Sequence, residues 1–343
     1  MTVNRLAVER YQPTPEEREF LLEAGLVRIP LHIPFQIEPV NAVLVLGDPP
    51  ALIDTGMRYK NNVEIVGQVL AEHGLAWSDL GEIWLTHPHL DHFGLAGEFA
   101  AMSGAQVRAW QASQSRFEEY LDHWAHARRG YLELLALSGV EPDRIEQSRN
   151  SPSHFHEMAG PAQIHRTVAA QEGVWMAGRH RATLLHVPGH SPWCTAFWLD
   201  GPGILIGGDV LLERFPSNPV YYPDDVSPLS WQGLATYQKS LRRLGELPIQ
   251  KVVPGHGLSF GEHRKVVQRL MMRQDNRLER VRNLLQQGPH TVYAMAQAVF
   301  SPEMTKHALF LVMSETLRYL QWLTDLGEAR PVQASNRLEY HPV

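Results

Sequence analysis

Residues 84–94 read WLTHPHLDHFG and place three histidines and one aspartate within six positions, directly after an apolar run. His87 and His89 lie two positions apart, and Asp91 and His92 follow them closely. A tight loop at the end of a strand can turn several imidazoles and a carboxylate toward one volume, and borderline divalent cations bind that mixture of ligands. By itself, the stretch fits either a metal-binding loop or a polar turn that is rich in histidine.

Three later segments favour the metal-binding interpretation. They read LLHVPGH, ILIGGD and KVVPGH, and each runs from an apolar strand through a glycine-containing break to one metal-capable side chain: His190, Asp209 and His256. An α/β scaffold builds sites at such strand ends, because the backbone there is rigid and access is open. Seven candidate ligands are too many for one tetrahedral zinc ion but suit two ions about 3.5 to 4 Å apart. Because the set contains no cysteine, a catalytic site is favoured over a closed structural one.

The order of these motifs resembles a known family. HPHLDH, with IDTG before it and PGH, GGD and PGH after it, is similar to the signature of the metallo-β-lactamase-fold hydrolase superfamily, over roughly residues 25–260. The resemblance implies an α/β fold, an αββα sandwich of two mixed sheets with the site at one edge. It also implies two divalent metal ions, with zinc expected and iron or manganese as alternatives.

The resemblance further implies a role for each candidate. The first ion would be bound by His87, His89 and His190, the second by Asp91, His92 and His256, and Asp209 would bridge the two. In LIDTG, Asp54 would support the site by hydrogen bonding rather than by binding metal. A strand-ending aspartate in a turn with Gly56 explains Asp54 equally well from the sequence alone.

The chemistry expected of such a site is hydrolysis. Metal lowers the pKa of bound water from 15.7 to about 7, which gives a bridging hydroxide that can attack a carbonyl or phosphoryl centre. Asp91 is the candidate catalytic residue, because it is placed both to bind metal and to accept or deliver a proton. No cysteine nucleophile is required, and Cys194 is expected to pack as a small buried residue.

Composition narrows the class of protein. The 343 residues are 44% hydrophobic and 20% charged, which suits a packed enzyme-sized fold, and the net charge of -6 argues against an overall basic field for nucleic acid. With a single cysteine, no intramolecular disulfide can form. The first residues lack a secretory signal, and no run approaches the roughly 20 apolar residues of a membrane span. We expect a soluble cytoplasmic protein without a membrane segment.

The pattern along the chain predicts two domains. Short strands and helices alternate up to residue 260, interrupted at about 110–160 by a helical insertion rich in aromatic residues. Residues 143–161 of that insertion are polar and rich in turn residues. We predict a catalytic domain over 1–260 and a winged-helix-like domain of three helices and a terminal hairpin over 261–343. The insertion is interpreted as a lid over the substrate pocket or a homodimer contact, with a surface helix as the alternative.

Different branches of the family act on different substrates, and the C-terminal residues help to choose between them. The tail is similar to that of the lactamase-β-like 2 group, some members of which cleave single-stranded RNA. The helix expected to recognise nucleic acid, residues 304–320, offers only Lys306 and Arg318 as full positive charges beside Glu315, and phosphate binding needs a more basic face. A small ester, thioester or lactone is therefore favoured, with a phosphodiesterase or endoribonuclease as the alternative.

Other branches remain open from the sequence. Glyoxalase II is similar in the PGHSP and GGD regions, but its basic, tyrosine-bearing glutathione segment is not found here. The persulfide dioxygenases, with one iron, are an alternative of another class, and a binding protein without activity is the least favoured. Tyr221 or Tyr222 would orient a carbonyl near the site, unless they lie in an exposed turn. Surface positions are expected for the remaining histidines considered as ligands: His123, His126, His154 and His156.

Overall fold

The computed structural model describes residues 5–35, 37–150, 157–168, 172–177, 180–222, 233–334 and 336–343. Among these residues, six strands form a first sheet in their order along the chain, with β1 to β3 antiparallel and β3 to β6 parallel. Their bounds are β1 Leu26–Leu31, β2 Val40–Val45, β3 Ala51–Ile53, β4 Glu82–Trp84, β5 Gln106–Trp110 and β6 Arg166–Val168.

A second sheet has the strand order β11-β10-β9-β8-β7 within the described ranges. Its strands pair antiparallel except β10 and β11, which are parallel. The bounds are β7 Glu172–Ala177, β8 His180–His186, β9 Thr195–Leu199, β10 Ile204–Gly208 and β11 Lys251–Pro254.

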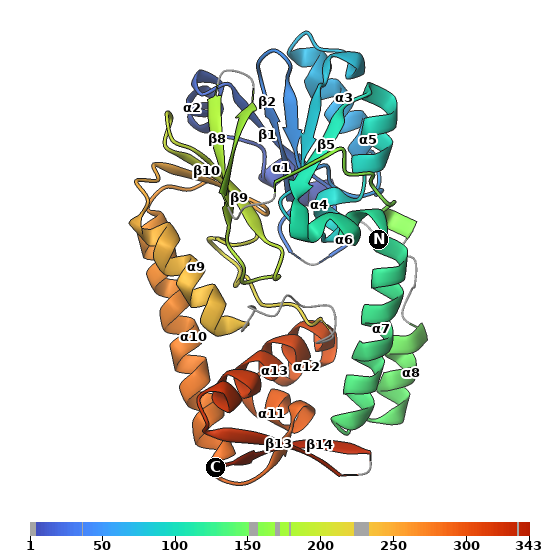
Figure 1. Ribbon diagram of the computed structural model, residues 1–343, viewed down its shortest axis with the longest axis vertical. Helices are drawn as coiled ribbons and strands as arrows, with labels where there is room; N and C mark the ends of the chain where they lie inside the picture. The colour runs from blue at the N-terminus through green and yellow to red at the C-terminus, as the bar shows by residue number, and fades with distance from the viewer. Residues whose placement is uncertain are drawn as a thin grey trace.

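The two sheets pack face to face, and helices cover their outer faces (Figure 1). In β2, Val43 and Val45 lie in the core between the sheets, whereas Ala42 and Leu44 lie in the core beneath the helices. Successive side chains of a strand point to opposite faces, so a strand buried on both faces has no polar side. The helices are α3 Asn62–Glu72 and α5 Ala96–Ser103 on the first sheet, and α9 Leu234–Glu246 and α10 His263–Leu285 on the second. The predicted αββα sandwich is confirmed.

Further helices lie at the ends of the sandwich, in the insertion and in the C-terminal segment. They are α1 Arg5–Arg10, α2 Pro15–Glu23, α4 Leu90–Phe93, α6 Gln114–Glu118, α7 Tyr120–Leu137, α8 Pro142–Asn150, α11 Val292–Val299, α12 Pro302–His307 and α13 Leu309–Asp325, with the 3-10 turns η1 Trp77–Asp79 and η2 Gln111–Ser113. The C-terminal segment also contains a small sheet with the strand order β12-β14-β13. Its strands are β12 His290–Thr291, β13 Ala329–Ala334 and β14 Arg337–Pro342.

The insertion is helical, as expected, and its helices α7 and α8 extend from the sandwich to the C-terminal helices (Figure 1). Arg144 on α8 donates through Nη1 to the hydroxyl of Tyr293 on α11 at 2.7 Å. The ring of Tyr131 on α7 lies edge-on to that of Phe310 on α13, with 4.9 Å between centroids. The aromatic face of the insertion therefore packs against another part of the same chain.

The turn-rich interpretation of residues 143–161 was wrong for its first part, which forms α8. Helix α8 has no buried residue, and Ile145 is its hydrophobic residue that packs against the large hydrophobic cluster. The apolar periodicity that predicts a helix is therefore weak in this segment. Contact with α7 and the Arg144 hydrogen bonds stabilises the helix instead. His154 and His156 lie outside the described residues.

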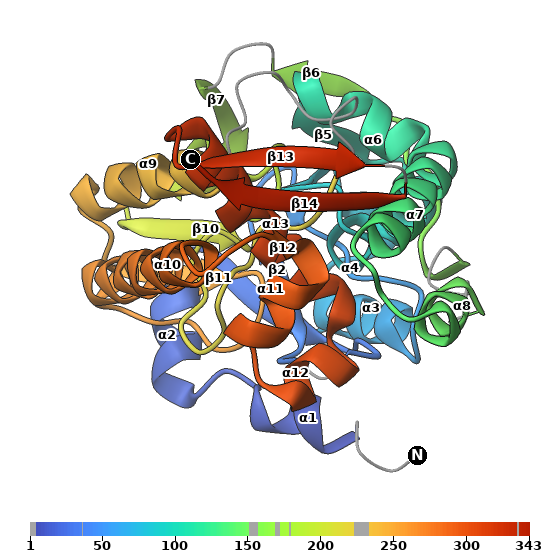
Figure 2. The same cartoon turned by 90° about the horizontal axis from the view of Figure 1, so that it is seen from below.

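The C-terminal segment contains the expected helices and hairpin, but the predicted helix beginning at residue 304 is divided at Ala308 into α12 and α13. Seen from below in Figure 2, the hairpin of β13 and β14 crosses the end of the molecule opposite the sandwich. One hydrophobic cluster runs from the second sheet through α9 and α10 into α11 and α13. We propose that a domain boundary lies at residue 260 and that residues 261–343 form a winged-helix-like domain packed on the second sheet. In the described part of the chain, none of the helices has the length and apolar character needed to cross a membrane.

Candidate metal centre

The candidate ligands lie where the carboxyl ends of strands from both sheets meet. Asp54 follows β3, residues 87–92 follow β4, and Asp209 and His256 follow β10 and β11. The parallel pairing of β3 with β4 and of β10 with β11 brings these ends to the same edge. His190 comes from the loop after β8. The strand order thus gathers residues from positions far apart in the sequence.

The HPHLDH stretch is part loop and part helix. His89 has extended φ and ψ of -90° and 139° and precedes α4, a single helical turn that carries Asp91 and His92. A tight loop after the strand was predicted, and within it the backbone N–H of His92 donates to the carbonyl of His89 at 2.9 Å and closes the helical turn. Both Asp91 and His92 on this turn are buried, and His92 is completely enclosed.

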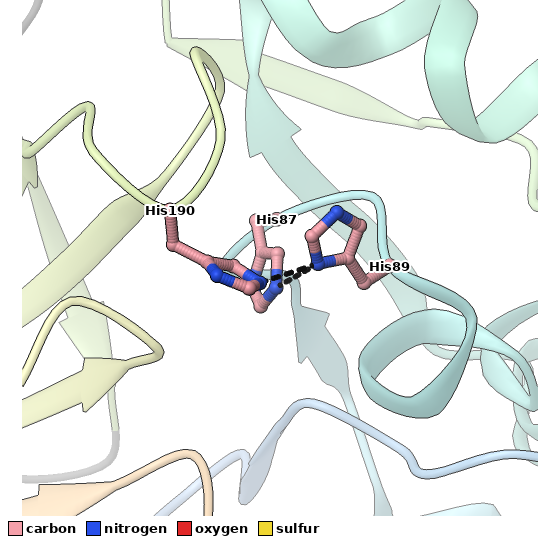
Figure 3. A group of neighbouring side chains, drawn as sticks. All are labelled: His87, His89 and His190. Atoms are coloured by element: carbon pink, nitrogen blue, oxygen red, sulfur yellow. Dashed lines mark hydrogen bonds between the residues drawn. The ribbon is translucent and has the colours of Figure 1, made fainter. Parts of the chain in front are cut away.

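Three histidine rings converge on one point (Figure 3). Nδ1 of His89 lies 3.0 Å from Nε2 of His87 and 2.8 Å from Nε2 of His190. His87 and His89 come from the loop after β4 and His190 from the loop after β8, and the facing nitrogens of the three rings form an inward-directed group. We call His87, His89 and His190 the three-histidine group.

The outward nitrogens of the same rings are each held by a neighbour. Nδ1 of His87 lies 3.0 Å from the hydroxyl of Thr86, and Nδ1 of His190 lies 2.6 Å from the backbone carbonyl of Asn218. Nε2 of His89 lies 2.6 Å from the hydroxyl of Tyr222. Such contacts fix the orientation and tautomer of a metal-binding imidazole. The sequence pattern did not indicate Thr86 or Asn218, and Tyr222 is partly buried rather than placed in an exposed turn.

A second group adjoins the first. Nε2 of His256 lies 3.4 Å from Oδ2 of Asp91 and 3.5 Å from Oδ2 of Asp209, and Oδ2 of Asp209 is also 3.4 Å from Nε2 of His190. The ligand atoms of Asp91, His92 and His256 all lie within 4.8 Å of one another, as do those of His87, His92 and Asp209. Asp209 therefore stands between the second group and the three-histidine group.

The donor set fits divalent cations. Within the described part of the chain, Nε2 of His92 and Oδ1 of Asp209 are buried and make no hydrogen bond. They face each other at 3.3 Å. Buried polar atoms that make no hydrogen bond are costly, so two at one point indicate a place for a ligand. Imidazole nitrogens with carboxylate oxygens are the donors that zinc and similar ions prefer.

Asp54 supports this centre through hydrogen bonds. Its Oδ1 accepts from the backbone N–H of Thr86 at 2.9 Å, and its Oδ2 accepts from the Thr86 hydroxyl at 2.7 Å and from Nδ1 of His92 at 2.8 Å. The residue has a positive φ of 58°, uncommon for a side chain other than glycine. This conformation turns the carboxylate back toward the loop after β4.

His256 is held by the first sheet. Its Nδ1 lies 3.0 Å from the carbonyl of Glu38, and the side-chain amide of Asn41 donates to the carbonyls of Pro254 and Gly257 on either side of it. At Gly255, a Cβ would lie 2.2 Å from Oδ1 of Asp209 and 2.7 Å from Cε1 of His92. Only glycine fits at that position without displacing two candidate ligands.

Burial keeps the three-histidine group neutral. Desolvation holds the pKa of His87 well below its usual value and lowers the pKa of His89 to about 3. It also lowers the pKa of His190. Neutral imidazoles are the form that binds metal, so these rings need lose no proton before they accept an ion.

The second group has the opposite electrostatics. Burial disfavours the charged form of His256, but Asp209 and Asp91 outweigh it and raise the pKa of His256 to about 10. The pKa of His92 is likewise raised against burial by Asp209 and Asp54. Burial would raise the pKa of Asp91, yet the hydrogen bond from His256 and the charge of His92 lower it to about 2. The carboxylates therefore attract positive charge, which before metal binds is supplied by protons on His92 and His256.

The other described residues that the sequence singled out are not members of these groups. His123 on α7 faces Glu119 at 3.5 Å, and His126 is partly exposed on the same helix. Cys194 is buried, and desolvation raises the pKa of its thiol to about 12, which makes it a packing residue rather than a nucleophile.

The fold is that of the metallo-β-lactamase-like enzymes. The model of the metallo-beta-lactamase superfamily matches residues 36–256, and the chain belongs to that superfamily. With a donor set that can hold metal, the chain is a metal-dependent hydrolase.

Individual relatives cover more of the chain than the family model does. The probable metallo-hydrolase YqjP of Bacillus subtilis (strain 168) is 31% identical over 300 residues, which cover 87% of this chain and 91% of the relative. The crystal structure of the metallo-beta-lactamase family protein TTHA1429 from Thermus thermophilus aligns with a TM-score of 0.77 and 26% identity, over 94% of this chain and 100% of that one. A Beta-lactamase domain protein from Burkholderia ambifaria has the same fold, with a TM-score of 0.77 and 22% identity over 93% and 92% of the two chains.

Proposed function

We propose that this protein is a binuclear hydrolase that cleaves a small ester, thioester or lactone. The observation that carries the proposal is the position of Asp209, whose two carboxylate oxygens face His92 on one side and both His190 and His256 on the other. A carboxylate shared between two groups of ligands suits two ions about 3.5 to 4 Å apart.

The proposed ligands follow the groups defined above. The three-histidine group would hold one ion, Asp91, His92 and His256 would hold the other, and Asp209 would lie between the two. We propose zinc for both positions because nitrogen and oxygen donors without cysteine suit a catalytic zinc site. When bound, the ions supply a water activated at neutral pH and charge to stabilise a developing oxyanion.

The side chains of the protein then hold the substrate and move the proton. Asp91 belongs to the second group and, with a pKa lowered to about 2, is ionised at neutral pH. It can accept the proton of the attacking water and deliver it to the leaving group. Asp54 keeps Nε2 of His92 directed into the centre by accepting from its Nδ1.

The charges of α13 support a carbonyl substrate over a nucleic acid. Arg318 is 5% exposed and Glu315 is 3% exposed, so neither is presented to an external phosphate backbone. Glu315 is paired with Arg277 on α10, and Arg318 donates to the carbonyl of Tyr222. Lys306 is left as the exposed cation of the predicted recognition helix, residues 304–320. One exposed cation provides little of the basic surface that binding to RNA requires.

A hydrolysis panel with metal quantification tests this function. The chain, reconstituted with zinc and then with manganese or iron, is assayed on a thioester, a lactone, a phosphodiester and a short single-stranded RNA. We expect two equivalents of metal and turnover of at least one carbonyl ester. Turnover of RNA or the phosphodiester alone would favour the alternative substrate class. One iron with oxygen consumption in the presence of a persulfide would contradict hydrolysis.

A further inference from the structure

The segment between Asp209 and Tyr222 is arranged around the three-histidine group. Within it, the carbonyl of Asn218 faces Nδ1 of His190 at 2.6 Å, and the backbone N–H of Val220 donates to the carbonyl of His190 at 2.9 Å. The segment ends with the Tyr222 hydroxyl 2.6 Å from Nε2 of His89. We call residues 216–222 the support segment. It contacts two of the three rings from outside the metal-binding face.

The contact to His89 decides which nitrogen is available to a metal. A neutral imidazole has one N–H and one lone pair. If Nε2 carries the hydrogen and donates it to the Tyr222 oxygen, Nδ1 presents its lone pair toward His87 and His190. The opposite tautomer would place an N–H among the facing nitrogens, where it would block an ion.

The Tyr222 ring is itself held in place. It lies parallel to the His89 ring with an interplanar angle of 8°, and edge-on to Trp193 with 4.8 Å between centroids. The backbone carbonyl of Tyr222 accepts from Nη2 of Arg318 at 3.3 Å. Arg318 lies on α13, in the C-terminal segment, and is buried.

We propose that Tyr222 is a positioning residue that fixes the tautomer and orientation of His89, and that Arg318 makes helix α13 part of this support. The C-terminal segment then contributes to metal affinity at the three-histidine group, and the group of Asp91, His92 and His256 does not depend on it. The inference rests on the proposed metal site.

The decisive variant is Tyr222→Phe, which removes the hydroxyl and keeps the ring that packs on His89 and Trp193. Loss of a hydrogen-bond partner to a metal-binding histidine lowers affinity by about 10- to 100-fold. We expect the metal affinity of the three-histidine group to fall by that factor in Tyr222→Phe. The matched control is Tyr221→Phe, because the ring of Tyr221 faces Tyr131 rather than a ligand.

Two variants of the protein allow metal binding to each group of ligands to be measured separately. His256→Ala leaves the three-histidine group intact, and His190→Ala leaves Asp91, His92 and His256. Each background is stripped of metal and titrated with Co²⁺ alone, with and without Tyr222→Phe, against a competing chelator. Affinity should fall only in the His256→Ala background, with a changed visible spectrum of the bound Co²⁺. If circular dichroism shows that His256→Ala or His190→Ala does not fold, the same comparison is made on the chain with both groups intact. The two steps of its Co²⁺ titration are then compared with and without Tyr222→Phe.

Arg318→Met tests the part played by α13, since it keeps the packed stem and removes the hydrogen bond to Tyr222. We expect a smaller loss of Co²⁺ affinity, confined to the same background. The role of Tyr222 would be overturned if Tyr222→Phe left Co²⁺ affinity unchanged in the His256→Ala background, or if it lowered affinity equally in both backgrounds. Unchanged Co²⁺ affinity in Arg318→Met would overturn the role of α13. Because no substrate is present, absence of ester turnover by the metal-loaded protein would contradict the proposed function and leave this comparison valid. A protein that binds no Co²⁺ would overturn both.

Discussion

Oδ2 of Asp54 lies 2.8 Å from Nδ1 of His92, although the two residues are 38 positions apart in the sequence. The same oxygen accepts from the hydroxyl of Thr86, whose oxygen in turn lies 3.0 Å from Nδ1 of His87. One carboxylate at the end of β3 thus supports a ligand of each proposed ion. This explains why Asp54 is buried beside the centre without facing the metal-binding side.

Replacing Asp54 should weaken both ions. Asp54→Asn preserves size but replaces one acceptor oxygen by an amide that donates hydrogen bonds. Either the backbone N–H of Thr86 loses its acceptor, or Nδ1 of His92 and the Thr86 hydroxyl both do. We expect metal affinity to fall by about 10- to 100-fold, measured by titration against a chelator. The exposed Asp200, which follows β9, provides the control Asp200→Asn. Unchanged metal affinity in Asp54→Asn would contradict the supporting role.

Asp209→Ala should have a larger effect, because it removes the oxygens that face both groups. We expect less than two equivalents of bound metal and no measurable turnover, determined by elemental analysis and by the hydrolysis panel. The variant also leaves His92 and His256 with less negative charge nearby. A fully active variant with two bound ions would refute the assignment of Asp209 as the bridge.

Gly255→Ala tests the close packing behind the centre. The added Cβ would meet Oδ1 of Asp209 at 2.2 Å and Cε1 of His92 at 2.7 Å, so at least one ligand must move. We expect lower metal content and a loss of turnover, while circular dichroism shows a folded chain. In Gly261→Ala the nearest atom to the added Cβ lies 3.5 Å away, so this control should retain both properties. Equal behaviour of the two variants would count against the steric argument.

Metal uptake should release protons at neutral pH. The pKa of His256 is raised to about 10 and that of His92 is raised as well, so both rings are protonated at pH 7 before an ion binds. The three-histidine group has lowered pKa values and is already neutral. We therefore expect proton release on filling the second group, and an affinity there that increases as pH rises from 7 toward 10.

Calorimetric titration of zinc in buffers with different ionisation enthalpies measures this release. Glu315→Gln, a change of a buried carboxylate outside the centre, serves as a control that should leave the number of released protons unchanged. Zinc binding at pH 7 without proton release at either group would contradict the electrostatics described for His92 and His256.

The fold could be predicted from the sequence to the extent that its signals are local. Short apolar runs bounded by turn residues predicted strands such as β2 and β9, and helical spacing predicted α3. Helix α8 was missed because it is stabilised by contacts with α7 and with residues far along the chain, such as Tyr293. A sequence window contains no trace of such contacts.

The sequence by itself determined the chemical types of the candidate ligands, their order and their places at the ends of apolar strands. Periodicity and glycine-containing breaks express local backbone preferences, which can be recognised along the chain. Only the tertiary structure decided that Asp209 stands between two groups and that Tyr222 reaches His89 from 133 positions away. These relationships depend on strand order and on how the sheets and α13 pack, because packing brings together side chains that no local pattern connects.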